Sequence, residues 1–428
     1  MPRLAGYINS VHMSSSEPSA PAAPASRAAV TTLLSVMFIN MLGFGIIVPL
    51  LPFYAQSFHA PAWQIALIFS AYSMGGFFGE PFWGRLSDRI GRRPLLISTL
   101  AANCVCYGLL AFAPNIWVAF VVRFFGGMFA GNGSVVQGYI ADVTPPDERA
   151  GRMSRMGAAF NVGFIVGPSL GGLLAHPSAG PIGFQLPILA ASGLAGLAAI
   201  GVFLFVKESR RPPKDYVKPP SRWVMTGFAF RHPVIGRLML LTFLVGFAFT
   251  GIESTFGLWS AARFQWTPQI LGIAFGLTGI VSATSQFFVT GPLSKRYGEA
   301  RMLAIGMGGT ALCILVQPFT HGVPTTMIAM CAMALFQSVA FPNSGALMSR
   351  AIDENHQGQI MGLNNATGAF ARFVGPLCAG LAFDSFSVDA PFFIGAAIVA
   401  PAILLAMSAG RAADRMGDDG RLTVRSGS

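Results

Sequence analysis

Charged residues are scarce in this chain. Asp, Glu, Lys and Arg together make up 11% of its 428 residues, whereas a typical soluble protein carries about 25%. Hydrophobic residues make up 53%, which excludes a disordered or collagen-like chain in spite of the 50 Gly and 29 Pro residues. Gly and Pro are frequent in helices that pack closely inside a bilayer. The composition therefore predicts an integral membrane protein.

Cysteine and histidine are also few. The five cysteines are odd in number and all lie inside apolar stretches, so we expect neither a disulfide framework nor a metal site. None of the six histidines lies in the middle of an apolar stretch, which argues against a histidine proton relay. No stretch pairs two carboxylates or places an activated nucleophile. We therefore expect no cofactor, no bound metal and no enzymatic activity.

Acidic residues are outnumbered by basic ones, 17 against 28. The basic residues form short clusters between apolar stretches rather than one continuous face, so nucleic-acid binding is not expected. Lys and Arg mark cytoplasmic loops in membrane proteins. They lie in both tails and in the even-numbered connections, whereas the opposite side carries only Arg263. Both termini are therefore predicted to be cytoplasmic.

Long apolar runs dominate the remainder. A bilayer core needs about 20 apolar residues per helix, and about twelve segments of this kind are present: 30–54, 64–84, 94–113, 116–141, 152–175, 184–206, 234–260, 268–291, 301–319, 324–350, 358–383 and 390–409. The predicted fold class is an all-α integral membrane protein of twelve helices in two six-helix halves. Its expected domains are a disordered cytoplasmic tail, the first half, a basic cytoplasmic linker, the second half and a cytoplasmic tail, at 1–27, 28–206, 207–233, 234–410 and 411–428.

The second half repeats the first at an offset of roughly 207 residues. "GRLSDRIG" from Gly84 returns as "GPLSKRYG" from Gly291. "FIVGPSLGG" around Gly167 returns as "RFVGPLCAG" around Gly375, and "PPDERAGRM" returns as "AIDENHQGQI". Ordered echoes of this kind indicate two equivalent halves.

These motifs resemble the major facilitator superfamily. The segment "GRLSDRIGRR" is similar to its loop motif, and Gly163, Gly167, Pro168, Gly171 and Gly172 resemble the antiporter motif of its drug-exporting branches. "GFGIIVPLLP" and "YIADVTPPDER" look most like bacterial tetracycline efflux proteins. The resemblance implies proton-coupled export of drug-like molecules by alternating access around a mid-membrane site. A metabolite symporter or facilitator of the same fold is the alternative.

The resemblance also implies a cytoplasmic latch that holds the outward-facing state. Its residues are Gly84, Asp88, Arg89, Gly91, Arg92 and Asp142. Asp88 would cap the helix that begins near Gly358, and Arg92 would bridge to Asp142. The alternative is that the arginines only anchor the topology. The second copy has Lys295 in place of Asp88, so a second latch is expected to be weak or absent.

Ionisable residues inside a span are functional candidates, and four are present: Glu80, Arg123, Glu253 and Arg372. Glu253 is a candidate proton carrier, because burial favours the protonated carboxyl group; a permanent ion pair that holds its helix is the alternative. Arg123 matches the superfamily's arginine in span 4, which implies a role in proton coupling. We expect Glu80 to pair with a loop arginine, and leave Arg372 open between packing and substrate contact.

The chain departs from the tetracycline exporters at their acidic positions. Asn40, Cys106 and Gly309 stand where those proteins carry aspartates, so their proton path and their substrate are not implied here. We expect a monomer that binds a neutral or cationic amphiphile. The candidate cavity residues are Asn40, Gln137, Asn161, Gln286, Gln337, Asn343, Asn365 and Arg372.

Overall fold

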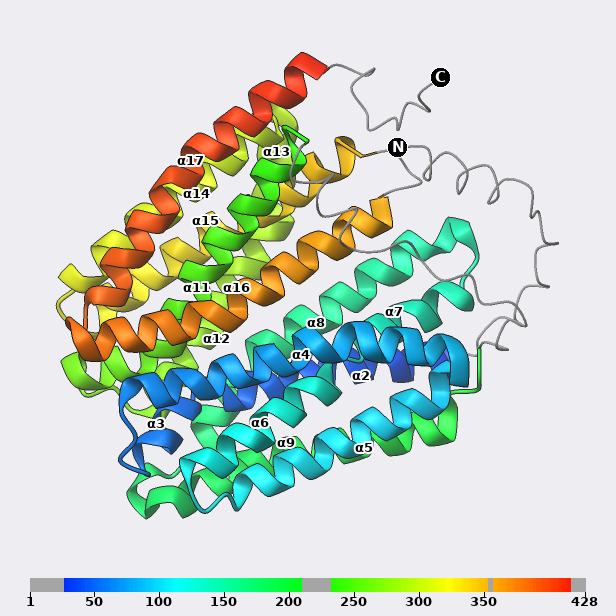
Figure 1. The fold of residues 1–428 in the computed structure, drawn as a ribbon, viewed down its shortest axis with the longest axis vertical. Coiled ribbons are helices and arrows are strands. Elements are labelled where there is room, and N and C mark those ends of the chain that lie inside the picture. Colours follow the sequence, from blue (N-terminus) through cyan, green and yellow to red (C-terminus); the bar gives the residue numbers. More distant parts are fainter. Residues whose placement is uncertain (1–26, 210–231, 353–356, 417–428) are drawn as a thin grey trace, which may run out of the picture.

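The computed structural model describes residues 27–209, 232–352 and 357–416, and all regular structure in these ranges is helical (Figure 1). The first half contains α2 (Arg27–Ile47), α3 (Leu51–Gln56), α4 (Ala62–Ile90), α5 (Arg92–Ala111), α6 (Ile116–Ala130), α7 (Gly133–Asp142), α8 (Pro146–Leu174), the 3-10 helix η1 (Pro177–Phe184) and α9 (Gln185–Phe205).

The second half contains α11 (Ile235–Phe264), α12 (Pro268–Ser285), the π-helical turn η2 (Gln286–Thr290), α13 (Gly291–Tyr297), α14 (Glu299–Val316), the 3-10 turn η3 (Gln317–Phe319), α15 (Val323–Arg350), α16 (Gln357–Ser385) and α17 (Ala390–Met416). The short tails and the linker predicted at 1–27, 207–233 and 411–428 lie largely outside the described residues.

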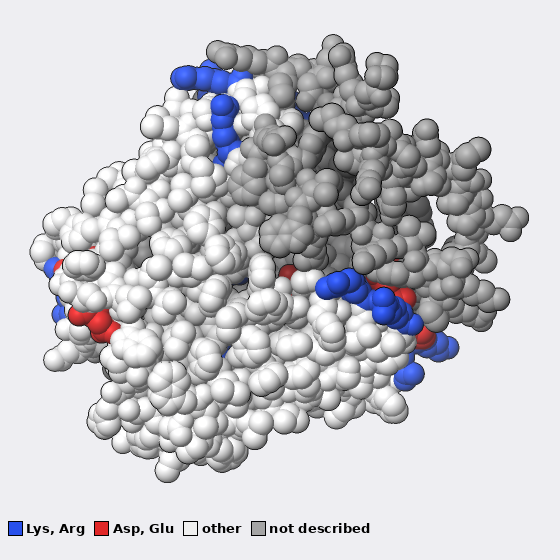
Figure 2. All heavy atoms as spheres, viewed as in Figure 1, with Lys and Arg blue, Asp and Glu red and all other residues white. Residues whose placement is uncertain are grey.

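Within the described ranges, eleven helical stretches are long and apolar enough to cross a membrane. The remaining predicted span is α4, a helix of 29 residues that carries polar side chains along its length, among them Gln64, Ser70, Ser73, Glu80 and Arg85. Figure 2 shows that Lys, Arg, Asp and Glu lie toward the edges of the visible face and leave a broad band almost free of charge. The predicted all-α membrane fold is confirmed.

Helix breaks modify three of the predicted spans. The first bends between α2 and α3, and the fourth divides into α6 and α7 at Gly131 and Asn132. The eighth passes through the π-helical turn η2 before it continues as α13. Breaks of this kind expose backbone groups that other helices must satisfy, so they occur where spans are packed inside protein.

The repeat is visible in the backbone of the two loop motifs. Gly91 (φ +102°) and Gly298 (φ +84°) adopt the same left-handed region, which disfavours residues with a Cβ atom. The amide of Gly91 donates to the carbonyl of Ser87, and the amide of Gly298 donates to the carbonyl of Ser294. Each glycine is followed at once by a helix, α5 or α14.

The two ends of the bundle differ. We call the end where α2 begins and α17 ends the terminal end, and the end that carries α3, η1 and η3 the far end. In Figure 1 the two halves approach each other at the far end and diverge toward the terminal end. Leu258 of α11 belongs to the hydrophobic core of the first half, and Phe53 packs on a core cluster of the second. The cores of the two halves therefore meet at the far end.

Candidate functional site at the seam between the halves

One carboxylate joins the two halves at the far end. Asp384, near the end of α16, accepts hydrogen bonds from the backbone amides of Ala62 (3.2 Å) and Trp63 (2.8 Å), at the start of α4. These amides belong to the first helical turn, where no partner exists within the helix. A negative charge at a helix N-terminus also interacts favourably with the helix dipole. Sequence reasoning missed Asp384, because a single acid at the end of an apolar run shows no partner.

A second pair of helices closes the same end. Ser169 Oγ of α8 donates to the carbonyl of Gly272 in α12 (3.3 Å), and Gln269 Nε2 donates to the carbonyl of Ala175 (2.8 Å). A Cβ atom on Gly172 would lie 2.6 Å from the Pro268 carbonyl oxygen. The backbones of α8 and α12 are therefore in contact, and the described state is closed at the far end.

The antiporter-motif residues form two contact faces on α8. Gly163, Gly167 and Gly171 lie against α2, and a Cβ atom on any of them would meet α2 backbone. Gly172 lies against α12 in the other half. Pro168 is inside α8, and its Cδ atom lies on the α2 face. The small residues let α8 touch a helix of each half.

The latch arginine is almost fully buried. Arg92 Nε lies 3.0 Å from Asp142 Oδ2, Arg92 Nη2 lies 3.2 Å from Asp88 Oδ1, and Arg92 Nη1 donates to Ser87 Oγ (2.9 Å). The predicted contact between Arg92 and Asp142 is present. Its role as a latch stays a prediction, because the side chains at the start of α16, which Asp88 was expected to cap, lie outside the described residues.

Three further residues complete this loop. Gly84 lies close to Ser134 of α7, and Arg89 is exposed. Glu208, which sequence reasoning missed, accepts hydrogen bonds from the backbone amides of Arg92 (2.9 Å) and Arg93 (3.1 Å). The N-terminus of α5 is thus capped from the chain that follows α9.

The second half carries an ion pair at the equivalent place with the charges exchanged. Arg350 Nη1 lies 3.2 Å from Glu299 Oε2. Glu299 corresponds to Arg92 of the first half, and Arg350 corresponds to Asp142. The Arg350 side chain is 76% exposed, against 9% for Arg92. An ion pair this exposed contributes little to stability. The contact is therefore compatible with the expected weaker latch in the second half.

Three of the ionisable residues inside the spans lie together. Arg372 of α16 is within electrostatic range of Glu253 of α11 and of Glu80 of α4, which belongs to the other half. Glu253 is half-buried, whereas Glu80 and Arg372 are exposed. Among the described residues, the charge that acts on Glu80 is Arg372, across the seam, rather than the loop arginine that was expected. Helix packing explains the difference, because α4 and α16 run side by side.

Arg123 lies apart from that group, inside the first half. Its side chain is buried, with 2% of the residue exposed. Its guanidinium carbon lies 4.2 Å from the centroid of the Tyr72 ring, a cation–π contact. Nε and Nη1 of Arg123 have no hydrogen-bond partner among the described residues.

The candidate amides separate into buried and exposed residues. Asn40 Nδ2 donates to Asn132 Oδ1 (3.0 Å), and Asn132 Nδ2 donates to Thr99 Oγ1 (3.2 Å). Asn343 Nδ2 donates to the Val339 carbonyl (2.7 Å). Asn40 thus bridges α2 to the break between α6 and α7, whereas the bond of Asn343 stays within α15. Gln337 is buried, and Gln137, Asn161, Gln286 and Asn365 are exposed.

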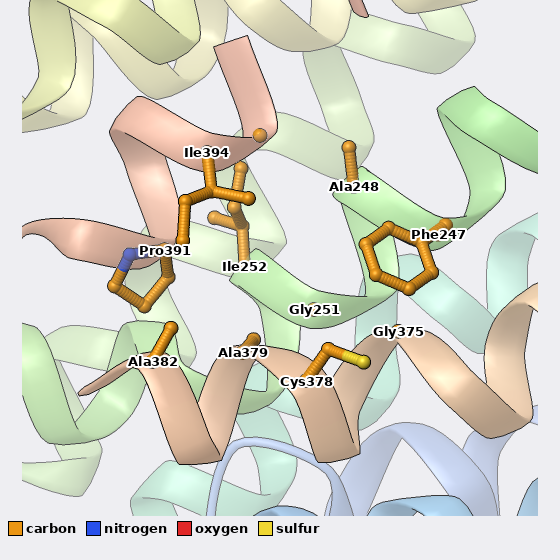
Figure 3. Close-up of a pocket in the computed structure, with 11 residues that line it drawn as sticks. Phe247, Ala248, Gly251, Ile252, Gly375, Cys378, Ala379, Ala382, Pro391 and Ile394 are labelled. Atoms are coloured by element: carbon orange, nitrogen blue, oxygen red, sulfur yellow. The ribbon is translucent and has the colours of Figure 1, made fainter. Parts of the chain in front are cut away.

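A small cavity of about 80 Å³ lies between α11, α16 and α17 (Figure 3). Its lining is apolar and rich in small residues, including Gly251, Gly375, Ala379 and Gly395. It offers no charged group that would orient a substrate. We do not assign the transport site to it.

Comparison with known proteins gives consistent results. The family model described as Major Facilitator Superfamily matches residues 33–289 and 238–418. The chain is 32% identical over 362 residues to the tetracycline resistance protein, class C, of Escherichia coli, which covers 82% of this chain and 88% of that protein. It is 26% identical over 381 residues to the multidrug resistance protein 2 of Bacillus subtilis, which covers 88% of this chain and 93% of that protein.

The fold has close structural neighbours. The crystal structure of the human organic anion transporter MFSD10 superposes with a TM-score of 0.66 at 23% sequence identity, over 89% of this chain and 99% of that one. An identity this low supports the fold alone.

Proposed function

The chain belongs to the major facilitator superfamily, and we propose that it is a proton-coupled antiporter that exports amphiphilic organic molecules across a bacterial inner membrane. Membership makes it a multi-span membrane transporter of small molecules rather than an enzyme. The names of its relatives, which include tetracycline and multidrug resistance proteins, support export as the direction. Cytoplasmic termini are part of the proposal, and they would put the far end outside.

The observation that carries the proposal is the position of Glu253. It is a half-buried carboxyl group in the middle of α11, within electrostatic range of Arg372. A carboxyl group inside a membrane span is costly unless it has a function or a partner. Beside a cation the carboxyl group can be ionised, and without a neighbouring cation it can hold a proton.

Arg372 would couple the protonation of Glu253 to the arrangement of the two halves. It interacts with Glu253 in its own half and with Glu80 in the other half. When Glu253 is protonated, its attraction for Arg372 disappears and the attraction of Glu80 remains. Proton binding would thus strengthen the tie across the seam relative to the tie within the second half. Substrate that enters beside Glu253 would favour release of the proton.

The contacts between the halves support alternating access. The described state is closed at the far end by Asp384 and by the contact of α8 with α12. In the opposite state these contacts would break, and the latch residues around Arg92 would hold the terminal end closed. The halves would then rock about a central site.

The substrate we propose is a small amphiphile, bound by a monomer. Asn40 stands where the tetracycline exporters carry an acid and is engaged with Asn132, so tetracycline itself is not assigned. Glu253 and Glu80 would favour a cationic group on the substrate.

The test is proton movement in proteoliposomes. Purified protein is reconstituted with a pH-sensitive dye inside, and lipophilic cations and tetracycline are added in turn, beside a Glu253→Gln variant. Proton movement that depends on substrate and is lost in the variant supports antiport. Substrate equilibration without proton movement in the wild type overturns it and makes the chain a facilitator.

A further inference from the structure

Arg123 is a buried cation that meets no anion among the described residues. It comes from α6 and is enclosed by α4 and α5. The groups within its electrostatic range are Tyr72, Tyr107 and Cys106, and all three are neutral near pH 7 in their ordinary states. No carboxylate of the described residues is among them. An isolated charge in a protein interior is strongly unfavourable unless a counter-charge or hydrogen bonds compensate it.

Two hydrogen-bond donors of Arg123 are also unsatisfied. Its buried Nε and Nη1 atoms have no partner among the described residues. The neighbouring Tyr107 side chain is buried and interacts with Asn103 and Tyr72. Two free donors on one guanidinium plane match the acceptor oxygens of a carboxylate.

The Tyr72 ring covers the guanidinium. Its face lies over Arg123, and it also contacts Phe44 of α2, with ring centroids 5.3 Å apart. Tyr72 and Phe44 are only half-buried, unlike Arg123 and Tyr107. The buried charge is therefore flanked by two aromatic side chains that are more accessible than it is.

We propose that Arg123 and Tyr107 form an anion-binding subsite that takes a monovalent anionic group, either a carboxylate on the transported amphiphile or a free chloride ion. The inference rests on the proposed export function and narrows its substrate class. The anion supplies the counter-charge that Arg123 lacks among the described side chains. A cationic group on the same molecule would remain free to reach Glu253.

The test compares two dyes that differ only in the anion. Rhodamine B carries a carboxylate, and its ethyl ester does not. Their dissociation constants are measured with purified protein in a sulfate buffer of low ionic strength, free of chloride and of carboxylates, without a proton gradient. Wild type is expected to bind the acid about tenfold more tightly than the ester, the size of a hydrogen-bonded charge pair.

Three variants decide the assignment. Arg123→Gln removes the cation and is expected to lose the preference for the acid while it keeps the affinity for the ester. Cys106→Asp puts an internal carboxylate beside Arg123 and is expected to have the same effect. Arg237→Gln removes an arginine that donates to the Ser408 carbonyl in the second half, and should keep the preference. If Arg123→Gln does not fold, the Cys106→Asp variant still tests the proposal.

A chloride titration separates the two sources of the anion. If chloride raises the melting temperature of the wild type but not of Arg123→Gln, and the two dyes bind equally, the subsite is occupied by free chloride. If the dyes bind equally and chloride has no effect, or if both Arg123→Gln and Cys106→Asp keep the preference for the acid, the subsite is refuted. Because binding is measured without a gradient, loss of proton antiport in vesicles would refute the proposed function and leave this inference standing.

Discussion

Asp384 and Trp63 connect the two halves at the far end: the Asp384 carboxylate accepts a hydrogen bond of 2.8 Å from the backbone amide of Trp63. A hydrogen bond to a charged group contributes about 1.5–3 kcal/mol. Asp384→Ala should therefore shift the equilibrium toward the state with an open far end by about tenfold or more. Spin labels at Phe112 and Phe386, exposed positions of the two halves at this end, would report the shift as a longer distance.

Asp389→Asn is the matched control for this experiment. Asp389 pairs with Arg263 and accepts from Trp259 Nε1, contacts that all lie within the second half. Its loss should leave the distance between the labels unchanged. An equal lengthening in both variants, or none in Asp384→Ala, would count against Asp384 as the tie between the halves.

The two copies of the latch pair should differ in their contribution to stability. Asp142→Asn leaves the buried Arg92 side chain with one carboxylate fewer, and we expect a loss of about 1–3 kcal/mol. Glu299→Gln acts on a pair whose arginine is 76% exposed, and the change should stay within about 0.5 kcal/mol. Thermal unfolding in detergent measures both. Equal losses would mean that burial does not separate the two pairs.

Gly172 is the motif residue that touches the other half. An added Cβ would lie 2.6 Å from the Pro268 carbonyl oxygen and 3.3 Å from the Gly272 Cα atom. Gly172→Ala should therefore force α8 away from α12, at a cost of about 1–3 kcal/mol for the closed far end, and reduce transport. Gly157→Ala is the control on the same helix, because nothing lies within 4 Å of its added Cβ. Transport unchanged by Gly172→Ala would contradict the close-packed seam.

His232 gives a dependence on pH outside the membrane spans. Its Nδ1 accepts from the backbone amides of Val234 (3.3 Å) and Ile235 (3.4 Å), and burial lowers the pKa of His232. Folding thus favours neutral histidine, so its contribution is present above the ordinary pKa of about 6.5 and is lost as pH falls below it. The melting temperature of the wild type should fall relative to His232→Asn between about pH 7.5 and 5.5. Parallel curves would show that this cap does not titrate.

Long-range hydropathy made the fold predictable from the sequence. Each predicted span is helical in the structure, because about 20 apolar residues in lipid have no other way to satisfy their backbone. The break at Gly131 and Asn132 was not predicted, since the apolar pattern continues through it. At the break α6 lies directly against α4, because a Cβ atom on Gly131 would meet the backbone of Glu80.

Contacts in the site could be predicted only where both interacting residues belong to a recognised sequence motif. The contact of Arg92 with Asp142 followed from the resemblance, whereas the approach of Arg372 to Glu80 joins two helices far apart in the chain. The exchanged pair of Glu299 and Arg350 could have been found by applying the repeat offset to the first pair. The isolation of Arg123 could not, since it depends on which side chains surround it in space.

The most direct test of the account is proton release when substrate binds. Purified protein in weakly buffered detergent near neutral pH is mixed with a lipophilic cation that it transports, and the pH of the solution is recorded. We predict release from the wild type and from Glu148→Gln, whose carboxyl group is exposed at the start of α8, and none from Glu253→Gln. Equal release from Glu253→Gln, or binding without release in the wild type, would contradict Glu253 as the proton carrier.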